Sequence, residues 1–169
     1  MRKALGSIIC LDSNVYAYAA SERGDTSQRR LTAEAQSLIG FVKLGMFRLL
    51  HSGLVDREID DFRNELARKR IERVVPQSRN VYRCVSEFLD LLDPAIALAN
   101  RLKLDGVDAL HAMIASAYGA TYLVSSENKN FISKLRAFRQ QEPKAYRREL
   151  GELRAVHSLE WHAEIIGHG

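Results

Sequence analysis

Short apolar runs alternate along the chain with longer segments that carry apolar residues at helical spacing. The runs are bounded by polar or turn residues and predict buried strands over 7–11, 46–50, 121–124 and 153–156. The longer segments predict helices over 31–44, 54–71, 81–104 with a kink at Pro94, 105–118, and a basic region 132–153 interrupted near Pro143. A further helix begins at Val15, and residues 73–75 before Pro76 are a candidate short strand.

Strands that alternate with helices of a dozen or more residues are typical of an α/β protein with a parallel sheet. The 169 residues contain no repeat, low-complexity tract or long linker, so we expect one domain over 1–169. Hydrophobic residues make up 46% and charged residues 27%, a globular composition that excludes disorder of the whole chain.

Several classes of protein are excluded by what the chain lacks. No apolar run approaches the ~18 residues of a membrane span, and the apolar stretch after the basic start is too short for a secretory signal. Cys10 and Cys84 are too few for a disulfide framework or a four-thiolate zinc site. We therefore expect a cytoplasmic protein in a reducing setting, with no membrane partner.

The net charge of +4 is unevenly distributed along the chain. Residues 63–83 carry +5, residues 132–154 carry +4, and the remainder carries −5. Such segregation indicates a polyanion partner with an acidic site nearby. The alternative is that the basic segments are simply solvated helix faces.

Four acidic residues lie where a parallel sheet brings them to one edge. Asp12 follows the first strand, Glu58 lies in the helix after the second, Asp108 begins the helix before the 121–124 strand, and Glu127 follows that strand. Because the carboxyl ends of parallel strands and the starts of the following helices share an edge where ligands bind, we expect these acids to lie close together.

Each acid taken alone has a structural alternative. Asp12 and Asp105 are good helix N-caps, and Asp108 stands where a capping box places an acid. Glu58 fits this interpretation less well, because it falls inside an apolar arc of its helix, and a buried carboxylate needs a partner or a metal. Clustered carboxylates call for a cation such as Mg²⁺ or Mn²⁺. This pattern indicates metal-assisted phosphodiester chemistry.

His111 lies within the apolar helix 105–118. A histidine in such a helix is more often a core residue whose polar atoms are satisfied. The alternative is contact with substrate, because the helix begins at the acidic edge.

The four acids lie in stretches that resemble the motifs of the PIN-domain nuclease family. LDSNVYAY (11–18) resembles the first motif, HSGLVDREI (51–59) the second, and LDGVDALHAMIASAYGATYLVSSENKNF (104–131) the third and fourth. RAVHSLEW (154–161) resembles the last strand and the turn after it. The chain departs from the family in having Glu127 where Asp is usual, and in a basic helical insertion at about 132–153.

The resemblance implies a three-layer α/β/α sandwich around a central parallel sheet, and a Mg²⁺- or Mn²⁺-dependent endoribonuclease of the toxin type. It implies four catalytic residues that are also metal ligands: Asp12, Glu58, Asp108 and Glu127. It further implies that three neighbouring side chains orient these carboxylates without binding the metal themselves: Asn14, Ser125 and Asp105. Many small members of the family are toxins inhibited by an antitoxin protein, so an antitoxin is a predicted partner alongside the RNA substrate.

The basic insertion is predicted to bind the RNA backbone through Lys134, Arg136, Arg139, Arg147 and Arg148. A homodimer is also predicted, through exposed apolar residues of the 31–44 helix. Two other functions compete with the nuclease. One is a PIN-like domain that binds RNA or protein without cutting, which the Glu127 substitution favours. The other is a haloacid-dehalogenase-type phosphatase, which requires an Asp where this chain has Asn14.

Overall fold

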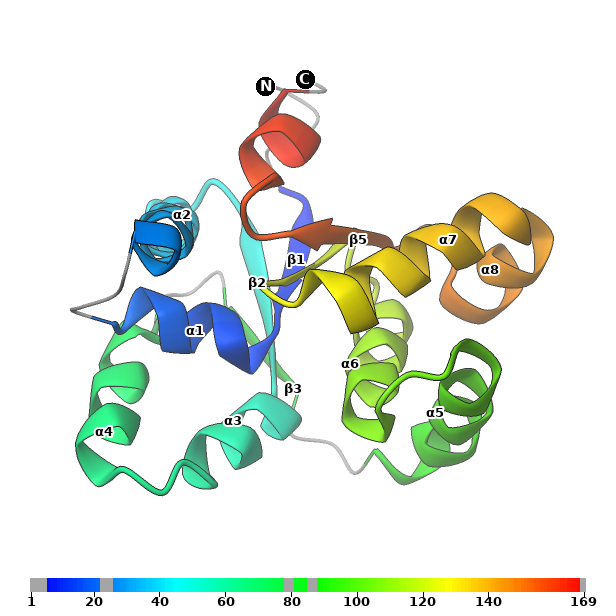
Figure 1. Ribbon diagram of the computed structural model, residues 1–169, viewed down its shortest axis with the longest axis horizontal. Coiled ribbons are helices and arrows are strands. Elements are labelled where there is room, and N and C mark those ends of the chain that lie inside the picture. Colours follow the sequence, from blue (N-terminus) through cyan, green and yellow to red (C-terminus); the bar gives the residue numbers. More distant parts are fainter. Residues whose placement is uncertain (1–5, 22–25, 78–80, 85–87, 168–169) are drawn as a thin grey trace.

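A five-stranded parallel sheet forms the centre of the computed structural model, which describes residues 6–21, 26–77, 81–84 and 88–167 (Figure 1). The strands are β1 (Ile8–Leu11), β2 (Arg48–Ser52), β3 (Val81–Cys84), β4 (Tyr122–Ser125) and β5 (Arg154–His157). Their order is β3-β2-β1-β4-β5, and every neighbouring pair is parallel. The predicted α/β class with a central parallel sheet is confirmed.

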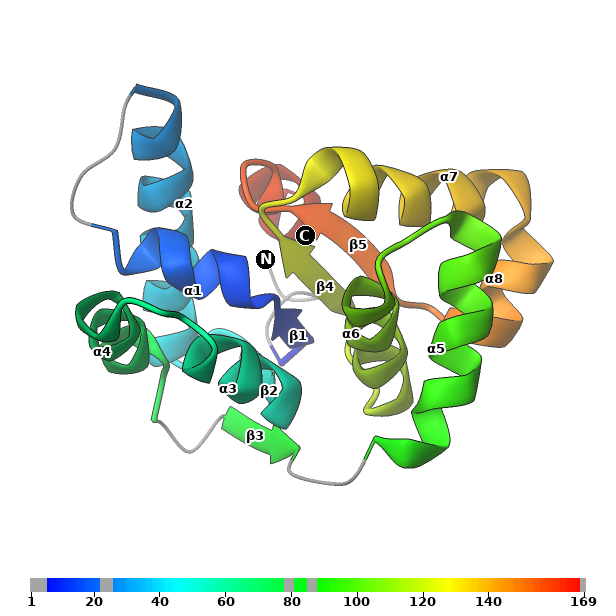
Figure 2. The same cartoon turned by 60° about the horizontal axis from the view of Figure 1, so that its bottom comes forward.

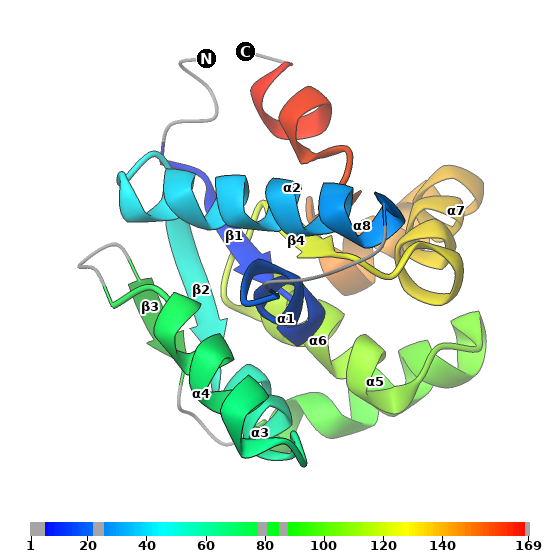
Figure 3. The same ribbon diagram turned by 60° about the vertical axis from the view of Figure 1, so that its left-hand side comes forward.

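Helices cover both faces of the sheet and make three layers (Figures 2 and 3). One face carries α1 (Ser13–Ala19), α2 (Thr26–Lys43), α3 (Gly53–Asp60) and α4 (Glu65–Val74). The other carries α5 (Leu89–Leu102), α6 (Gly106–Ala117), α7 (Ser133–Gln141) and α8 (Pro143–Leu150). Two short π-helical turns, η1 (Asn128–Ile132) and η2 (His162–Ile166), follow β4 and β5.

Each face of the sheet has its own apolar core. Ile9 and Leu11 pack in the core under α1 and α2, whereas Cys10 and Leu123 pack in the core under α5 and α6. Strands buried on both faces need apolar residues at successive positions, which is why they appear as continuous runs in the sequence. None of the helices in the described part of the chain is long and apolar enough to cross a membrane.

Three predicted elements need correction. The predicted 54–71 helix is two helices, because Asn64 caps a new one and its side chain accepts a hydrogen bond from the Ala67 N–H at 3.0 Å. The short strand predicted over 73–75 is wrong, since 73 and 74 form the last turn of α4. The helix predicted from Val81 begins only at Leu89, because 81–84 pair with β2 as an edge strand.

Most of the apolar residues predicted for a dimer contact lie inside the protein. Ala35, Leu38, Ile39 and Val42 are all buried in the core beneath α2. Leu44, just after α2, is the exception, since it is 77% exposed. The homodimer remains a prediction.

The strand order creates a crevice at one edge of the sheet. From β1 the chain adds β2 and β3 on one side, and it later adds β4 and β5 on the other side. Such a switch in direction leaves an opening beyond the carboxyl ends of the two central strands, and ligands of open α/β sheets bind there. Here the central strands are β1, which ends at Leu11, and β4, which ends at Ser125.

Candidate metal centre

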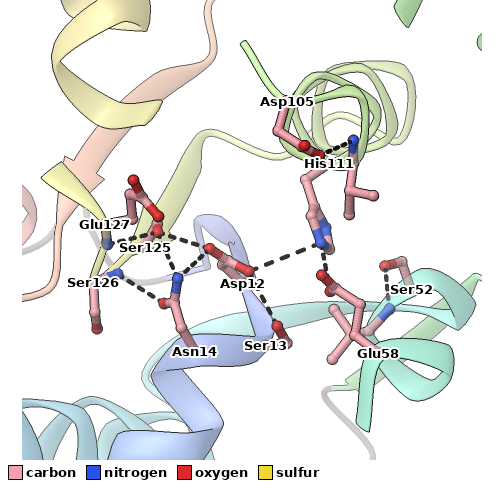
Figure 4. Close-up of polar contacts among 12 residues, drawn as sticks. Asp12, Ser13, Asn14, Ser52, Glu58, Asp105, His111, Ser125, Ser126 and Glu127 are labelled. Carbon is pink, nitrogen blue, oxygen red and sulfur yellow. Dashed lines mark hydrogen bonds and ion pairs between the residues drawn. The ribbon is translucent and has the colours of Figure 1, made fainter. Parts of the chain in front are cut away.

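Asp12 lies directly after β1, at the edge of the crevice, and is only 4% exposed. Its backbone N–H donates to the Val124 carbonyl at 3.0 Å and continues the pairing with β4. Asp12 occupies the N-cap position of α1, but its carboxylate makes no capping hydrogen bond. Instead, Oδ2 accepts from Ser125 Oγ at 2.7 Å and from Asn14 Nδ2 at 2.6 Å (Figure 4). The capping role therefore does not account for this carboxylate.

Asn14 and Ser125 form a small network that fixes one oxygen of Asp12. Asn14 Nδ2 also lies 3.1 Å from Ser125 Oγ, and its Oδ1 accepts from the Ser126 N–H at 2.8 Å. Ser125 Oγ accepts from the Glu127 N–H at 3.0 Å. The network ties the start of α1 to the end of β4. Asp12 Oδ1 takes no part in it and accepts only a long hydrogen bond from Ser13 Oγ, at 3.4 Å, among the described residues.

Glu58 and His111 complete a compact group with Asp12. His111 Nε2 lies 2.7 Å from Glu58 Oε2 and 3.8 Å from Asp12 Oδ1. One ligand atom from each of the three residues lies within 4.8 Å of the others. Two ligands on opposite sides of one Mg²⁺ are about 4.2 Å apart, so small side-chain movements bring these atoms to coordinating distances.

Asp108 lies beside this group, in the first turn of α6. Burial, together with the negative charges of Asp12, Glu127 and Asp105, raises the pKa of Asp108 to about 7. An acid whose pKa is raised by burial and by neighbouring acids marks a place where negative charge is poorly compensated. A divalent cation would offset that charge, so the residues fit such an ion.

Glu127 and Asp105 reach the centre differently from the other acids. Glu127 is exposed and acts on Asp108 through its charge. The Asp105 carboxylate accepts from the Val107 N–H at 2.8 Å and caps α6. The charge of Asp105 raises the pKa of Asp108, but within the described residues the Asp105 carboxylate makes no hydrogen bond to a residue of the site.

His111 holds a proton more tightly than an ordinary histidine. Burial lowers its pKa, but the hydrogen bond to Glu58 and the charges of Asp12, Glu58 and Asp108 outweigh burial and raise it. Its Nδ1 is buried and has no hydrogen-bond partner among the described residues. When protonated, the imidazole supplies positive charge between two carboxylates.

Sequence reasoning placed His111 in the core, and it is indeed only 1% exposed. What that reasoning missed is the contact between its Nε2 and the acidic group. The sequence feature that could have predicted this contact is the spacing of three residues between Asp108 and His111, because residues three apart on a helix are neighbours on one face.

The basic residues predicted to bind RNA lie on α7 and α8: Lys134, Arg136, Arg139, Arg147 and Arg148. Arg136 is held against β5, where Nε donates to the Ala155 carbonyl at 3.1 Å and the guanidinium pairs with Glu160 at 2.7 Å. Arg147 and Arg148 are exposed and pair with nearby glutamates of the same segment. These two are the arginines most available to a polyanion.

The other two basic residues have no acidic partner within the described ranges. Lys134 Nζ donates to the Lys103 carbonyl, and the Arg139 guanidinium lies 5.9 Å from the centre of the Tyr146 ring. α7 follows η1 directly, so it begins at the carboxyl edge of the sheet and leads away from it. Since β5 begins at Arg154 beside Tyr122, the end of α8 lies toward the opposite edge.

Comparison of the chain with protein-family models, with curated proteins and with solved structures gives no match. The argument for a function therefore starts from the geometry and charge of this centre.

Proposed function

We propose that the chain is a metal-dependent endoribonuclease of the PIN-domain type, which hydrolyses RNA phosphodiester bonds with Mg²⁺ or Mn²⁺. The observation that carries the proposal is the meeting of Asp12, Glu58 and His111 within 4.8 Å at the crevice of the sheet. These residues come from three separate segments of the chain. The neighbouring acid Asp108 keeps its proton to about pH 7, which supports a site built for added positive charge.

The roles of the residues follow from which oxygens face the centre. Asp12 Oδ1 and the Glu58 carboxylate would hold the ion, with Asp108 beside them and Glu127 at the rim. When bound, a divalent cation supplies a nucleophilic water at neutral pH and stabilises negative charge on the reacting phosphate. Ser125 and Asn14 keep the other oxygen of Asp12 occupied, so that Oδ1 faces the centre.

Two groups at the centre are suited to handling a proton. The Asp108 carboxyl has a pKa of about 7, and His111, whose pKa is raised by Glu58 and the neighbouring acids, lies with Nε2 against Glu58. Each is placed to take or release a proton as substrate arrives and leaves. We assign them to proton transfer rather than to packing alone, because both lie at the crevice beside the group that could hold an ion, where shifted pKa values are typical of functional residues.

The proposal also includes a path for the RNA substrate and a surface for an inhibitor protein. The RNA backbone would follow α7 from the carboxyl edge toward Arg147 and Arg148, two of the exposed cations of α8. A role as the toxin of a toxin–antitoxin pair would require an inhibitor protein that covers the Asp12 side of the crevice.

The test is cleavage of a mixed RNA pool by the wild type and by Asp108→Asn, each with Mg²⁺, Mn²⁺ or EDTA. We expect cutting by the wild type with metal, and none with EDTA or with the variant. Asp90→Asn is the matched control, because Asp90 also lies in the first turn of a helix, α5, away from the crevice. If the wild type cuts no RNA with either metal, Mn²⁺ calorimetry interprets that result. Mn²⁺ binding without cutting indicates a selective substrate, and absence of Mn²⁺ binding favours the non-catalytic alternative.

A further inference from the structure

A second polar cluster lies next to the candidate metal centre and contributes no ligand to it, with two buried residues and a third, Asp56, whose side chain is half exposed. It consists of Tyr16, His51 and Asp56, which we call the Tyr16–His51–Asp56 chain. Tyr16 Oη lies 3.2 Å from His51 Nδ1, and the two rings meet edge to face with centroids 5.6 Å apart. His51 Nε2 lies 2.7 Å from Asp56 Oδ1. Tyr16 is fully buried and His51 is 1% exposed.

The direction of the hydrogen bonds in this chain follows from its chemistry. An ionised carboxylate only accepts, so His51 Nε2 carries a hydrogen and donates to Asp56. Nδ1 of a neutral imidazole then accepts from the Tyr16 hydroxyl. Burial lowers the pKa of His51 despite the hydrogen bond to Asp56, and burial raises the pKa of Tyr16. Both directions favour the neutral, fully paired arrangement.

The three residues come from elements that also carry the metal-centre acids. Tyr16 lies on α1, one turn after Asp12. His51 lies at the end of β2, and Asp56 lies on α3 two residues before Glu58. The chain of hydrogen bonds therefore connects the helix that begins at Asp12 to the helix that carries Glu58, and the two helices pack against each other (Figure 3).

The length of α3 makes this connection important. α3 has only eight residues and begins at a cap in which Ser52 Oγ accepts from the Val55 N–H at 3.4 Å. A bound ion tolerates little error in the positions of its ligands, so the supporting contacts of those ligands set its affinity. Asp56 lies two residues before Glu58 on α3, and its carboxylate contacts the buried His51.

We propose that Tyr16, His51 and Asp56 are positioning residues that hold α3 against α1, so that Glu58 and Asp12 keep the separation a divalent cation requires. This inference rests on the proposed metal centre. It assigns no substrate contact to the three residues.

Two matched pairs of variants test the inference by Mn²⁺ calorimetry. Tyr16→Phe is compared with Tyr146→Phe, because Tyr146 is equally buried and its hydroxyl donates to the Leu153 carbonyl at 2.7 Å on the other face of the sheet. Asp56→Ala is compared with Asp60→Ala. Both remove one carboxylate from α3, and both positions lie two residues from Glu58.

We expect Tyr16→Phe and Asp56→Ala to weaken Mn²⁺ binding by about 10-fold, as the loss of supporting contacts around metal ligands does. Tyr146→Phe and Asp60→Ala should change it less than about threefold. The two tyrosine variants should lose similar thermal stability, so a difference in Mn²⁺ affinity reports position rather than unfolding.

Asp56→Asn distinguishes the contribution of the Tyr16–His51–Asp56 chain from that of the ion pair between Asp56 and Arg83. Arg83 on β3 lies 3.6 Å from Asp56 Oδ2, and an amide would not preserve that ion pair. An amide oxygen still accepts from His51 Nε2, so the inference predicts near wild-type Mn²⁺ affinity for Asp56→Asn. Equal affinities within both matched pairs would overturn the inference and leave the metal centre standing. Absence of Mn²⁺ binding by the wild type would overturn the proposed function, and the inference with it.

Discussion

Replacing Asp108 by Asn tests two effects of one carboxylate that change stability in opposite directions. Asp108 lies in the first turn of α6, where an acid next to the helix dipole stabilises by roughly 0.3–1 kcal/mol. It also faces the charges of Asp12, Glu127 and Asp105, which together with burial disfavour its ionised form. If the interaction with the helix dipole is larger, Asp108→Asn is less stable than the wild type. If the cost of the ionised carboxylate is larger, the variant is more stable.

The shift in pKa gives the combined cost of burying the ionised carboxylate and placing it beside other acids, with burial the larger cause. Moving the pKa of Asp108 from 3.8 to about 7 corresponds to ~4 kcal/mol at ~1.36 kcal/mol for each pH unit. Asp108 is only half-buried, so solvent screening reduces this to roughly 1–2 kcal/mol. That value exceeds the dipole contribution. We therefore expect metal-free Asp108→Asn at pH 8 to be more stable than the wild type by about 1 kcal/mol.

The gain in stability should depend on pH with a definite sign. Because the folded-state pKa of Asp108 lies above its unfolded value, the wild type keeps its full stability below pH 3.8 and loses part of it as the pH rises to about 7. The advantage of the Asn variant should therefore be small near pH 4 and complete at pH 8.

The assay is denaturant unfolding of the wild type and Asp108→Asn in EDTA, at pH 5 and at pH 8. Asp90→Asn on α5 is the control for the dipole, and we expect it to lose a few tenths of a kcal/mol. Adding Mn²⁺ should stabilise the wild type more than Asp108→Asn. If Asp108→Asn is destabilised at pH 8 as Asp90→Asn is, burial and the neighbouring acids do not disfavour the ionised Asp108 carboxylate as argued. Full RNA cleavage by Asp108→Asn would refute its place in the centre.

Three further changes test other parts of the reasoning. Asp12→Asn should abolish cleavage of the RNA pool while circular dichroism stays that of the wild type, and residual cutting at the wild-type rate would remove Asp12 from the centre. Ser125→Ala should weaken Mn²⁺ binding in calorimetry by about 10- to 100-fold, because Oδ2 of Asp12 loses a donor; unchanged affinity would make that hydrogen bond incidental. Reversing the charge of Arg147 and Arg148 together should weaken RNA binding, measured by fluorescence anisotropy, and reduce its dependence on salt. An unchanged salt slope would place the RNA path away from α8.

The central strands were predictable from the sequence, whereas the edge strand was not. β1 and β4 are buried on both faces, so their apolar residues follow one another without interruption. β3 is an edge strand with Tyr82 half exposed and Arg83 polar, and its four residues carry no comparable run. The helical spacing that continues after it therefore dominated the prediction for 81–104.

The acidic edge was predictable from topology, but the division of labour among the acids was not. Asp12 and Glu58 were predicted to lie together from their places after β1 and β2, and both are in the compact group. Asp105 and Asp108 lie within one turn of α6, and only the structure separates the carboxylate that caps the helix from the one surrounded by other acids. Both residues are aspartates near the start of the same helix, so residue type and position in the sequence do not distinguish the capping carboxylate from the one among the acids.

The central pair of strands also sets when the centre can exist during synthesis of the chain. Asp12 and Ser125, which bond each other across β1 and β4, are 113 residues apart in the sequence. A growing chain that has exposed only β1, β2 and β3 therefore has an unpaired central strand and no complete centre. Contacts between segments this distant in sequence form slowly, because the long loop between them must close first. If the protein cuts RNA, this order of assembly keeps the unfinished chain inert while it is still attached to the ribosome that makes it.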